Sequence, residues 1–235
     1  MIARRWRAGR GANTVAVVDR TPFVPAAGRD WLLPLYDPLT LLLGVGRFHR
    51  RLLAQADIAA GSRVLEVGCG TGTLTILARR LHPAADVTGI DPDPNALARA
   101  RRKAQRRGVV VRFELAYAEQ LPFPEASFDR VLSALMLHHL GAEAKGPALR
   151  EVRRVLAPGG SLHVADFDPG GHGRGVHGAL ARLVHGRHAR VVRSPVLDML
   201  RDEGFAHARE VERRASIMGL IVFYRAERSP SPAPA

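Results

Sequence analysis

The residues between Arg63 and Leu81 constrain the fold more than any other part of the chain. The apolar run Arg63–Val67 has the pattern of a buried strand, and Thr73–Leu81 has the pattern of a helix. Between them the sequence reads Gly-Cys-Gly-Thr-Gly, residues 68–72. Glycines let the backbone turn sharply and let a ligand reach the main chain, because no Cβ intervenes. A strand, a glycine turn and a helix in this order predict a parallel α/β sheet with a ligand at the turn.

The turn differs from the glycine motifs that bind phosphate. Thr73 stands where the dinucleotide pattern G-x-G-x-x-G requires its third glycine. Glu66 places a carboxylate beside the turn, where it would repel a pyrophosphate, and no lysine or arginine lies between Glu66 and Thr75, which excludes a P-loop. A nucleoside that carries positive charge and no phosphate fits better. S-adenosylmethionine, with its ammonium and sulfonium groups, is such a ligand.

A second strand is predicted at Asp86–Asp91, and its last residue is a candidate ribose ligand. Asp91 lies about 20 residues beyond the glycine turn, where a carboxylate can accept hydrogen bonds from both ribose hydroxyls. The alternative is that Asp91 caps the helix predicted over residues 92–105. Its position at the strand end favours ribose binding.

Strand-like and helical segments continue to alternate beyond this point. The further predicted elements are strands at 109–115, 128–137 and 161–167, a helix at 148–156, a sixth strand at 205–211, and a last strand at 220–226 that returns antiparallel to the sixth. This alternation predicts one α/β domain with a doubly wound, Rossmann-like, seven-stranded sheet, mostly parallel with an antiparallel last strand. At 235 residues, such a domain can bury an adequate core without disulfides.

Four motifs occur in the order and spacing of a known family. They are residues 64–72, residues 89–91, residues 118–123 with Ser127-Phe128-Asp129, and residues 149–160, which end in Ala-Pro-Gly-Gly. Together they make residues 31–227 resemble the class I S-adenosylmethionine-dependent methyltransferases. The resemblance is to the ubiquinone/menaquinone-type branch, which methylates small molecules. It implies in-line transfer of a methyl group from S-adenosylmethionine to a small, apolar or aromatic acceptor.

The resemblance also implies which residues hold the cofactor. Glu66 and the glycine backbone would hold the methionine part, Asp91 the ribose, and the segment around Ala118 the adenine. In chain order, the implied cofactor-binding residues are Glu66, Gly68, Cys69, Gly70, Gly72, Asp91, Pro92, Ala118 and Glu119. The chain departs from its relatives at Tyr117, where they usually carry an Asp that accepts the adenine amino group. Tyr117 would offer a hydroxyl, stack on the adenine, or be a partly buried surface aromatic.

Three residues are predicted to act on the methyl group or the acceptor. Tyr36 lies in a leucine-rich segment that the resemblance identifies as a helical lid over residues 31–60, and it would face the sulfonium. His139, at the end of the fourth strand, would orient the acceptor or take its proton, as would Asp166 at the end of the fifth. The alternative for the Tyr36 segment is an amphipathic helix packed on the core. The alternatives for His139 and Asp166 are a structural histidine at the strand end and an aspartate that caps a loop. His138 is less favoured than His139.

Other histidines do not predict a metal site. His172, His177, His185 and His188 follow the fifth strand, but no acid or cysteine accompanies them in a metal-binding spacing. A loop and helix over the acceptor pocket is the better interpretation of this stretch, so no metal is expected.

The strongly basic composition leaves a second function open. A net charge of +13 and a pI near 11.4 would suit a nucleic-acid methyltransferase or an anionic membrane surface. Only Lys103 and Lys145 are lysines, and the abundance of Arg, Ala, Gly and Pro is typical of a GC-rich coding sequence. Residues 135–138 also lack the Asn/Asp-Pro-Pro-aromatic turn used for exocyclic amines. Nucleic acid is therefore an unlikely partner, weak association with anionic surfaces stays open, and the third alternative is a non-catalytic S-adenosylmethionine-binding protein.

The composition of the two ends of the chain and the single cysteine predict the domain bounds and the cellular compartment. Residues 1–30 are expected to be a mobile Arg- and Gly-rich segment, 31–228 the methyltransferase domain, and 229–235 a disordered tail. A lone Cys69 suits a reducing compartment, and packing in the turn explains it better than nucleophilic duty. With no recognisable signal peptide or transmembrane span, a cytoplasmic location is expected.

Overall fold

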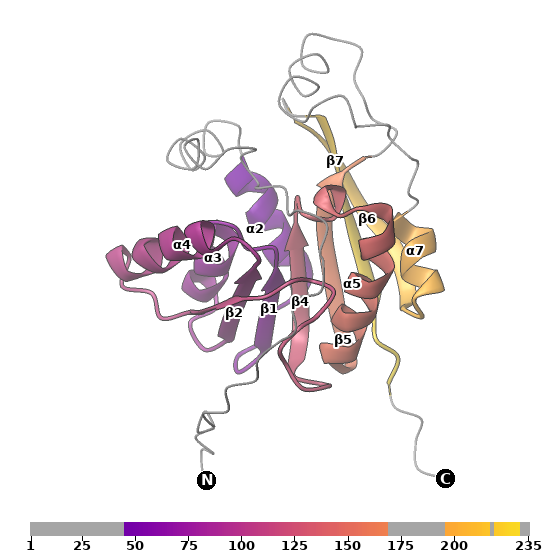
Figure 1. The fold of residues 1–235 in the computed structure, drawn as a ribbon. Helices are drawn as coiled ribbons and strands as arrows, with labels where there is room; N and C mark the ends of the chain where they lie inside the picture. Colours follow the sequence, from indigo (N-terminus) through magenta and orange to yellow (C-terminus); the bar gives the residue numbers. More distant parts are fainter. Residues whose placement is uncertain (1–44, 169–195, 217–218, 231–235) are drawn as a thin grey trace.

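The structure is a computed structural model that describes residues 45–168, 196–216 and 219–230, and within these residues seven strands form one sheet (Figure 1). The strands are β1 (Arg63–Val67), β2 (Asp86–Asp91), β3 (Arg112–Leu115), β4 (Phe128–Ala134), β5 (Leu156–Phe167), β6 (Ala206–Ser216) and β7 (Gly219–Glu227). The helices are α2 (Val45–Ala56), α3 (Thr73–Leu81), α4 (Pro94–Arg106), the 3-10 helix η2 (Leu137–His139), α5 (Ala142–Val155) and α7 (Val196–Asp202). Residues 1–44 and 169–195, which hold Tyr36, the first part of the predicted lid (31–44) and the four later histidines, lie outside the described residues.

The strand order is β3-β2-β1-β4-β5-β7-β6. All strand pairs among β1 to β5 are parallel, whereas β7 runs antiparallel to both of its neighbours, β5 and β6. The mostly parallel, doubly wound sheet with an antiparallel last strand predicted from the sequence is therefore confirmed.

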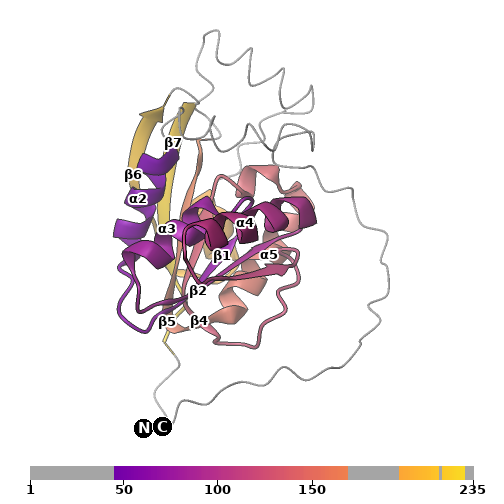
Figure 2. The same ribbon diagram turned by 90° about the vertical axis from the view of Figure 1, so that its left-hand side faces the viewer.

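Successive residues of each buried strand face opposite layers, and this alternation builds two cores. Val64 packs with Leu52 of α2 and Leu74 of α3, while the next residue, Leu65, packs with Leu149 of α5. Figure 2 shows α2 and α3 on one side of the sheet and α5 on the other. Because both faces are covered, the central strands carry continuous apolar runs, as is typical of parallel sheets.

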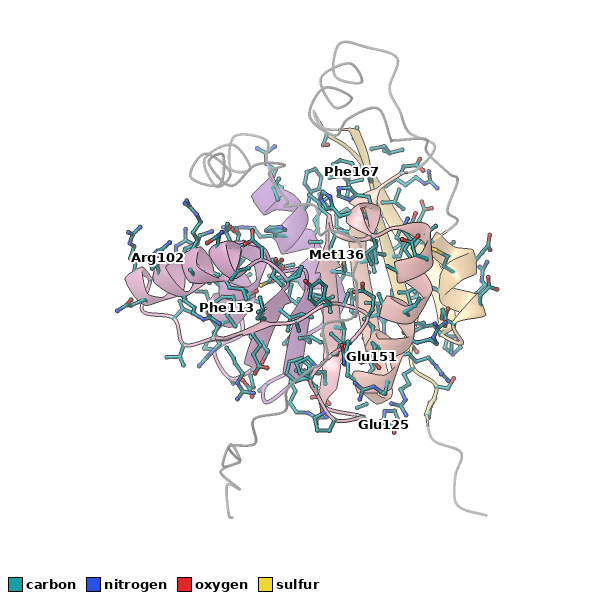
Figure 3. All side chains as sticks on the ribbon, in the orientation of Figure 1. Arg102, Phe113, Glu125, Met136, Glu151 and Phe167 are labelled. Atoms are coloured by element: carbon teal, nitrogen blue, oxygen red, sulfur yellow. The ribbon has the colours of Figure 1, made fainter. Side chains whose placement is uncertain are left out.

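The strand order reverses between β1 and β4, which are direct neighbours although two further strands separate them in the chain. In open α/β sheets, ligands bind beyond the carboxyl ends of the strands at such a switch point. Met136 and Phe167 lie at this end of the sheet, and Glu125 lies at the opposite end (Figure 3). The switch point therefore places the candidate site above β1 and β4.

Several element boundaries differ from those predicted. Helix α5 begins at Ala142 and not at residue 148, and it accommodates Pro147 in its interior. Strand β5 begins at Leu156, because Leu156 pairs with Phe128 of β4, and the register then shifts before Ser161 pairs with Arg130. Strand β6 extends to Ser216, well beyond the predicted residue 211.

In the part of the chain that the structure describes, no helix combines the length and the apolar character needed to cross a membrane.

Candidate active site

The glycine turn is held in place by backbone hydrogen bonds to the neighbouring strand. The amides of Gly68 and Cys69 both donate to the carbonyl of Ile90 in β2, at 2.9 and 2.8 Å. Gly68, Gly70 and Gly72 have φ of 73°, 51° and 73°, in the left-handed region that residues with a Cβ rarely adopt. The turn therefore joins the ends of β1 and β2 in a shape that requires glycine.

The three glycines differ in what surrounds them. A Cβ on Gly68 would lie 2.2 Å from Cγ of Met136, and one on Gly72 would lie 2.8 Å from the side chain of Ala100 in α4. A Cβ on Gly70 would meet nothing within 4 Å. Packing thus requires glycine at positions 68 and 72, while Gly70 faces open space where a ligand can reach the backbone.

Asp91 holds the turn from the end of β2. One carboxylate oxygen accepts from the amide of Gly70 at 2.7 Å, and the other accepts from the amide of Asp93 at 2.9 Å. The helix-capping role considered for Asp91 belongs to Asp93, whose side chain accepts from the amide of Asn95 at the start of α4. A carboxylate has about four acceptor positions, so Asp91 keeps capacity for two ribose hydroxyls.

Glu66 is a buried acid beneath the turn. Its carboxyl accepts a hydrogen bond from the hydroxyl of Thr75, and the residue is 3% exposed. Burial, reinforced by the charge of Asp91, raises the pKa of Glu66 to about 8, against the lowering effects of Thr75 and Lys103. Near neutral pH the group is mainly protonated, so a cationic ligand would favour its ionised form.

The predicted adenine-side residues lie next to Asp91. The amide of Ala116 donates to the Asp91 carbonyl at 3.3 Å, which brings the segment after β3 to the end of β2. Along this segment Ala118 is buried and Glu119 is partly exposed, and Pro92, which follows Asp91, is partly exposed. Tyr117 is half-buried in a tight turn closed by the amide of Gln120. The adenine roles of these residues stay predictions.

Cys69 is buried within the same turn. Burial and the nearby carboxyls of Glu66 and Asp91 raise the pKa of its thiol. A buried, protonated thiol is a poor nucleophile, which agrees with a packing role.

The segment after β4 carries a strained residue. The strand ends at Ala134, earlier than predicted, and Leu135 has a φ of 54° although it is not glycine. The Leu135 amide donates to the Ala165 carbonyl at 2.8 Å, which fixes the turn. This turn places Met136 against Gly68 and starts η2, so the segment that carries His138 and His139 contacts the glycine turn directly.

The two predicted proton acceptors do not pair with each other. Asp166, which is 2% exposed, accepts from the backbone amide of His138 at 3.2 Å and bonds Nδ1 of the same residue at 2.6 Å. The ring of His138 packs on that of His139 at 4.0 Å and edge-on against Phe167 at 5.0 Å. The sequence favours His139 and does not predict that Asp166 orients His138. The available signal is that both residues lie near the carboxyl ends of adjacent parallel strands, His138 four residues after β4 and Asp166 within the last two residues of β5.

The side chains at the turn fit S-adenosylmethionine. Two buried carboxyls, Glu66 and Asp91, suit an ammonium and a pair of hydroxyls, and the space above Gly70 admits a ligand to the main chain. Neither acid suits a phosphate. This donor set agrees with the nucleoside ligand inferred from the sequence.

Comparisons with known proteins give the same assignment. Residues 64–160 match the family model of the methyltransferase domain. The chain is 43% identical to the demethylmenaquinone methyltransferase of Thermus thermophilus over 141 residues, which cover 59% of this chain and 63% of that protein. It is 36% identical over 137 residues to the ubiquinone/menaquinone biosynthesis C-methyltransferase UbiE of Burkholderia mallei, covering 56% and 55% of the two chains. The chain thus spans less than two thirds of these relatives' lengths.

A solved structure shares the fold at low sequence identity. The phosphoethanolamine N-methyltransferase 2 of Haemonchus contortus, in complex with S-adenosyl-L-methionine, matches with a TM-score of 0.72 at 15% identity. The match covers 91% of this chain and 61% of that one.

Proposed function

The chain belongs to the class I S-adenosylmethionine-dependent methyltransferases, and on that premise we propose that it methylates a small, apolar or aromatic molecule. The family and its cofactor are those predicted from the sequence motifs. The observation that carries the proposal is the bond from the Gly70 amide to Asp91, which fixes the glycine turn beside the buried Glu66.

The cofactor supplies an already activated methyl group, so the protein's main tasks are to bind, to orient and to exclude water. We assign Glu66 to the ammonium and Asp91 to the ribose hydroxyls, with the backbone at Gly70 in contact between them. Orientation alone can provide much of the acceleration, because effective molarities of well-placed groups reach about 10⁵ M or more.

The acceptor side carries aromatic rings and one oriented imidazole. His138, His139 and Phe167 pack together beyond the ends of β4 and β5 and offer flat surfaces to a ring-shaped acceptor. The names of the two relatives, a demethylmenaquinone and a ubiquinone/menaquinone methyltransferase, support an acceptor of the quinone type. When the acceptor must lose a proton, we assign its removal to Nε2 of His138, with Asp166 holding Nδ1.

The proposed function is tested by binding and by transfer. The intact protein is expected to bind S-adenosylhomocysteine in calorimetry, and to move a labelled methyl group from S-adenosylmethionine to a reduced demethylated quinone. The same transfer assay with RNA and DNA as acceptors tests the alternative function, nucleic-acid methylation, that the basic charge suggests. Label in a defined base, with none in the quinone, would replace this proposal with nucleic-acid methylation.

The affinity for S-adenosylhomocysteine is expected to rise with pH between pH 5.5 and 7. The pKa of Glu66 is raised to about 8 in the free protein, and a bound ammonium would lower it. The complex then binds one proton fewer, so the affinity should increase by about tenfold per pH unit in this window and level off above pH 8. Calorimetry in buffers of different ionisation enthalpy measures the released proton. A Glu66→Gln variant should lose the proton release, and wild-type binding without any proton release would contradict the assignment of Glu66.

A further inference from the structure

Helix α4 contacts the glycine turn through one cationic side chain. The ammonium of Lys103 donates to the hydroxyl of Thr71 at 2.9 Å and to that of Thr73 at 3.0 Å. These two threonines stand on either side of Gly72, where the turn passes into α3. The Lys103 side chain therefore links both residues that flank Gly72 to helix α4, which follows strand β2.

The choice of lysine at this position is unusual for this chain. Of its 35 lysines and arginines only two are lysines, and the neighbouring Arg102 is exposed and points away from the domain (Figure 3). An ammonium is a compact charge with three donors, whereas a guanidinium is a larger planar fork. The space is narrow, because Ala100, one turn earlier, already lies against Gly72. The site thus suits an ammonium and would have to widen for an arginine.

The contact acts on the part of the turn that faces the candidate ligand. Gly72 has a left-handed φ of 73°, and its amide donates to the Cys69 carbonyl at 2.8 Å, closing the loop that presents Gly70. Fixing the threonines around Gly72 therefore restricts the backbone at Gly70. The charge of Lys103 also lowers the pKa of Glu66, which favours the ionised form of that acid.

We propose that Lys103 is a positioning residue for the cofactor, which holds the glycine turn in its binding shape through Thr71 and Thr73. This inference rests on the proposed function, because it concerns the same cofactor site. Lys103 touches the turn and does not act on the acceptor. Its loss should therefore weaken cofactor binding and leave the transfer step intact.

The test compares cofactor affinity, turnover and stability in matched variants. In Lys103→Met, the Kd for S-adenosylhomocysteine and the KM for S-adenosylmethionine should both rise about tenfold, with kcat at saturating cofactor within twofold of wild type. Thr73→Val, which removes the hydroxyl, should raise the Kd, whereas Thr73→Ser, which keeps it, should not. Lys145→Met, which removes the other lysine, is the control and should bind as wild type does.

The outcomes separate this inference from the proposed function. If wild-type protein does not bind S-adenosylhomocysteine, the cofactor assignment fails. If wild type binds and both Lys103→Met and Thr73→Val bind equally well, only the positioning role is overturned, even where their melting temperatures fall. If Lys103→Met does not fold, Lys103→Arg takes its place in the test. Wild-type affinity in both Lys103→Arg and Thr73→Val would then overturn the positioning role.

Discussion

Replacing His138 with alanine is expected to lower kcat by about 100- to 10,000-fold for an acceptor that must lose a proton, because a positioned general base contributes an acceleration of that order. Asp166 bonds Nδ1 of His138 at 2.6 Å, and in the proposed mechanism Nε2 takes the proton. Asp166→Asn should give a loss of similar kind, because the amide no longer fixes the required tautomer. The measurement is single-turnover transfer of a labelled methyl group at saturating cofactor.

The matched control for this prediction is the neighbouring histidine. His139→Ala removes a ring whose centroid lies 4.0 Å from that of His138, but it leaves the bond between His138 and Asp166 in place. Both variants should bind S-adenosylhomocysteine within about twofold of wild type, since neither side chain contacts the glycine turn in the proposed arrangement. If His139→Ala loses turnover and His138→Ala does not, the proton acceptor is His139, as the sequence alone favoured.

The parts of the fold that were predictable are those fixed by local patterns. Strand β1, helix α3 and strand β2 were predicted with the bounds that the structure gives them, because apolar runs and glycines define each end. The antiparallel return of β7 was also predicted. By contrast, the start of α5 was missed because Gly146 and Pro147 are local breakers that tertiary packing overrides.

The parts of the site that were not predictable depend on contacts between distant residues. The left-handed φ of Leu135 ends β4 early, and no glycine in the sequence signals it. The pairing of Asp166 with His138 joins residues 28 positions apart and depends on how η2 turns. Lys103 lies within a run of arginines on α4, a pattern typical of a solvated helix face, although its ammonium reaches the glycine turn.

Replacing Asp91 with alanine is expected to weaken binding of S-adenosylhomocysteine by about 100-fold or more. The substitution removes the acceptor of the Gly70 amide as well as the proposed partner of the ribose hydroxyls. Hydrogen bonds to a charged group contribute about 1.5–3 kcal/mol each, so the loss of two corresponds to about 3 kcal/mol or more. Calorimetry on the purified variant measures the change in affinity. Asp91→Asn keeps one acceptor oxygen, so its affinity should lie between those of wild type and Asp91→Ala.

Asp93 supplies the control that separates binding from folding. It lies two residues away, is similarly buried, and caps α4 through the amide of Asn95. Asp93→Ala should lower the free energy of unfolding by about 1 kcal/mol, as the loss of a helix cap does, and change the affinity little. Asp91→Ala and Asp93→Ala would thus share a loss of stability but differ in affinity by about two orders of magnitude. Equal affinity in the two variants would show that Asp91 serves only the packing of the turn, and the ribose assignment would be wrong.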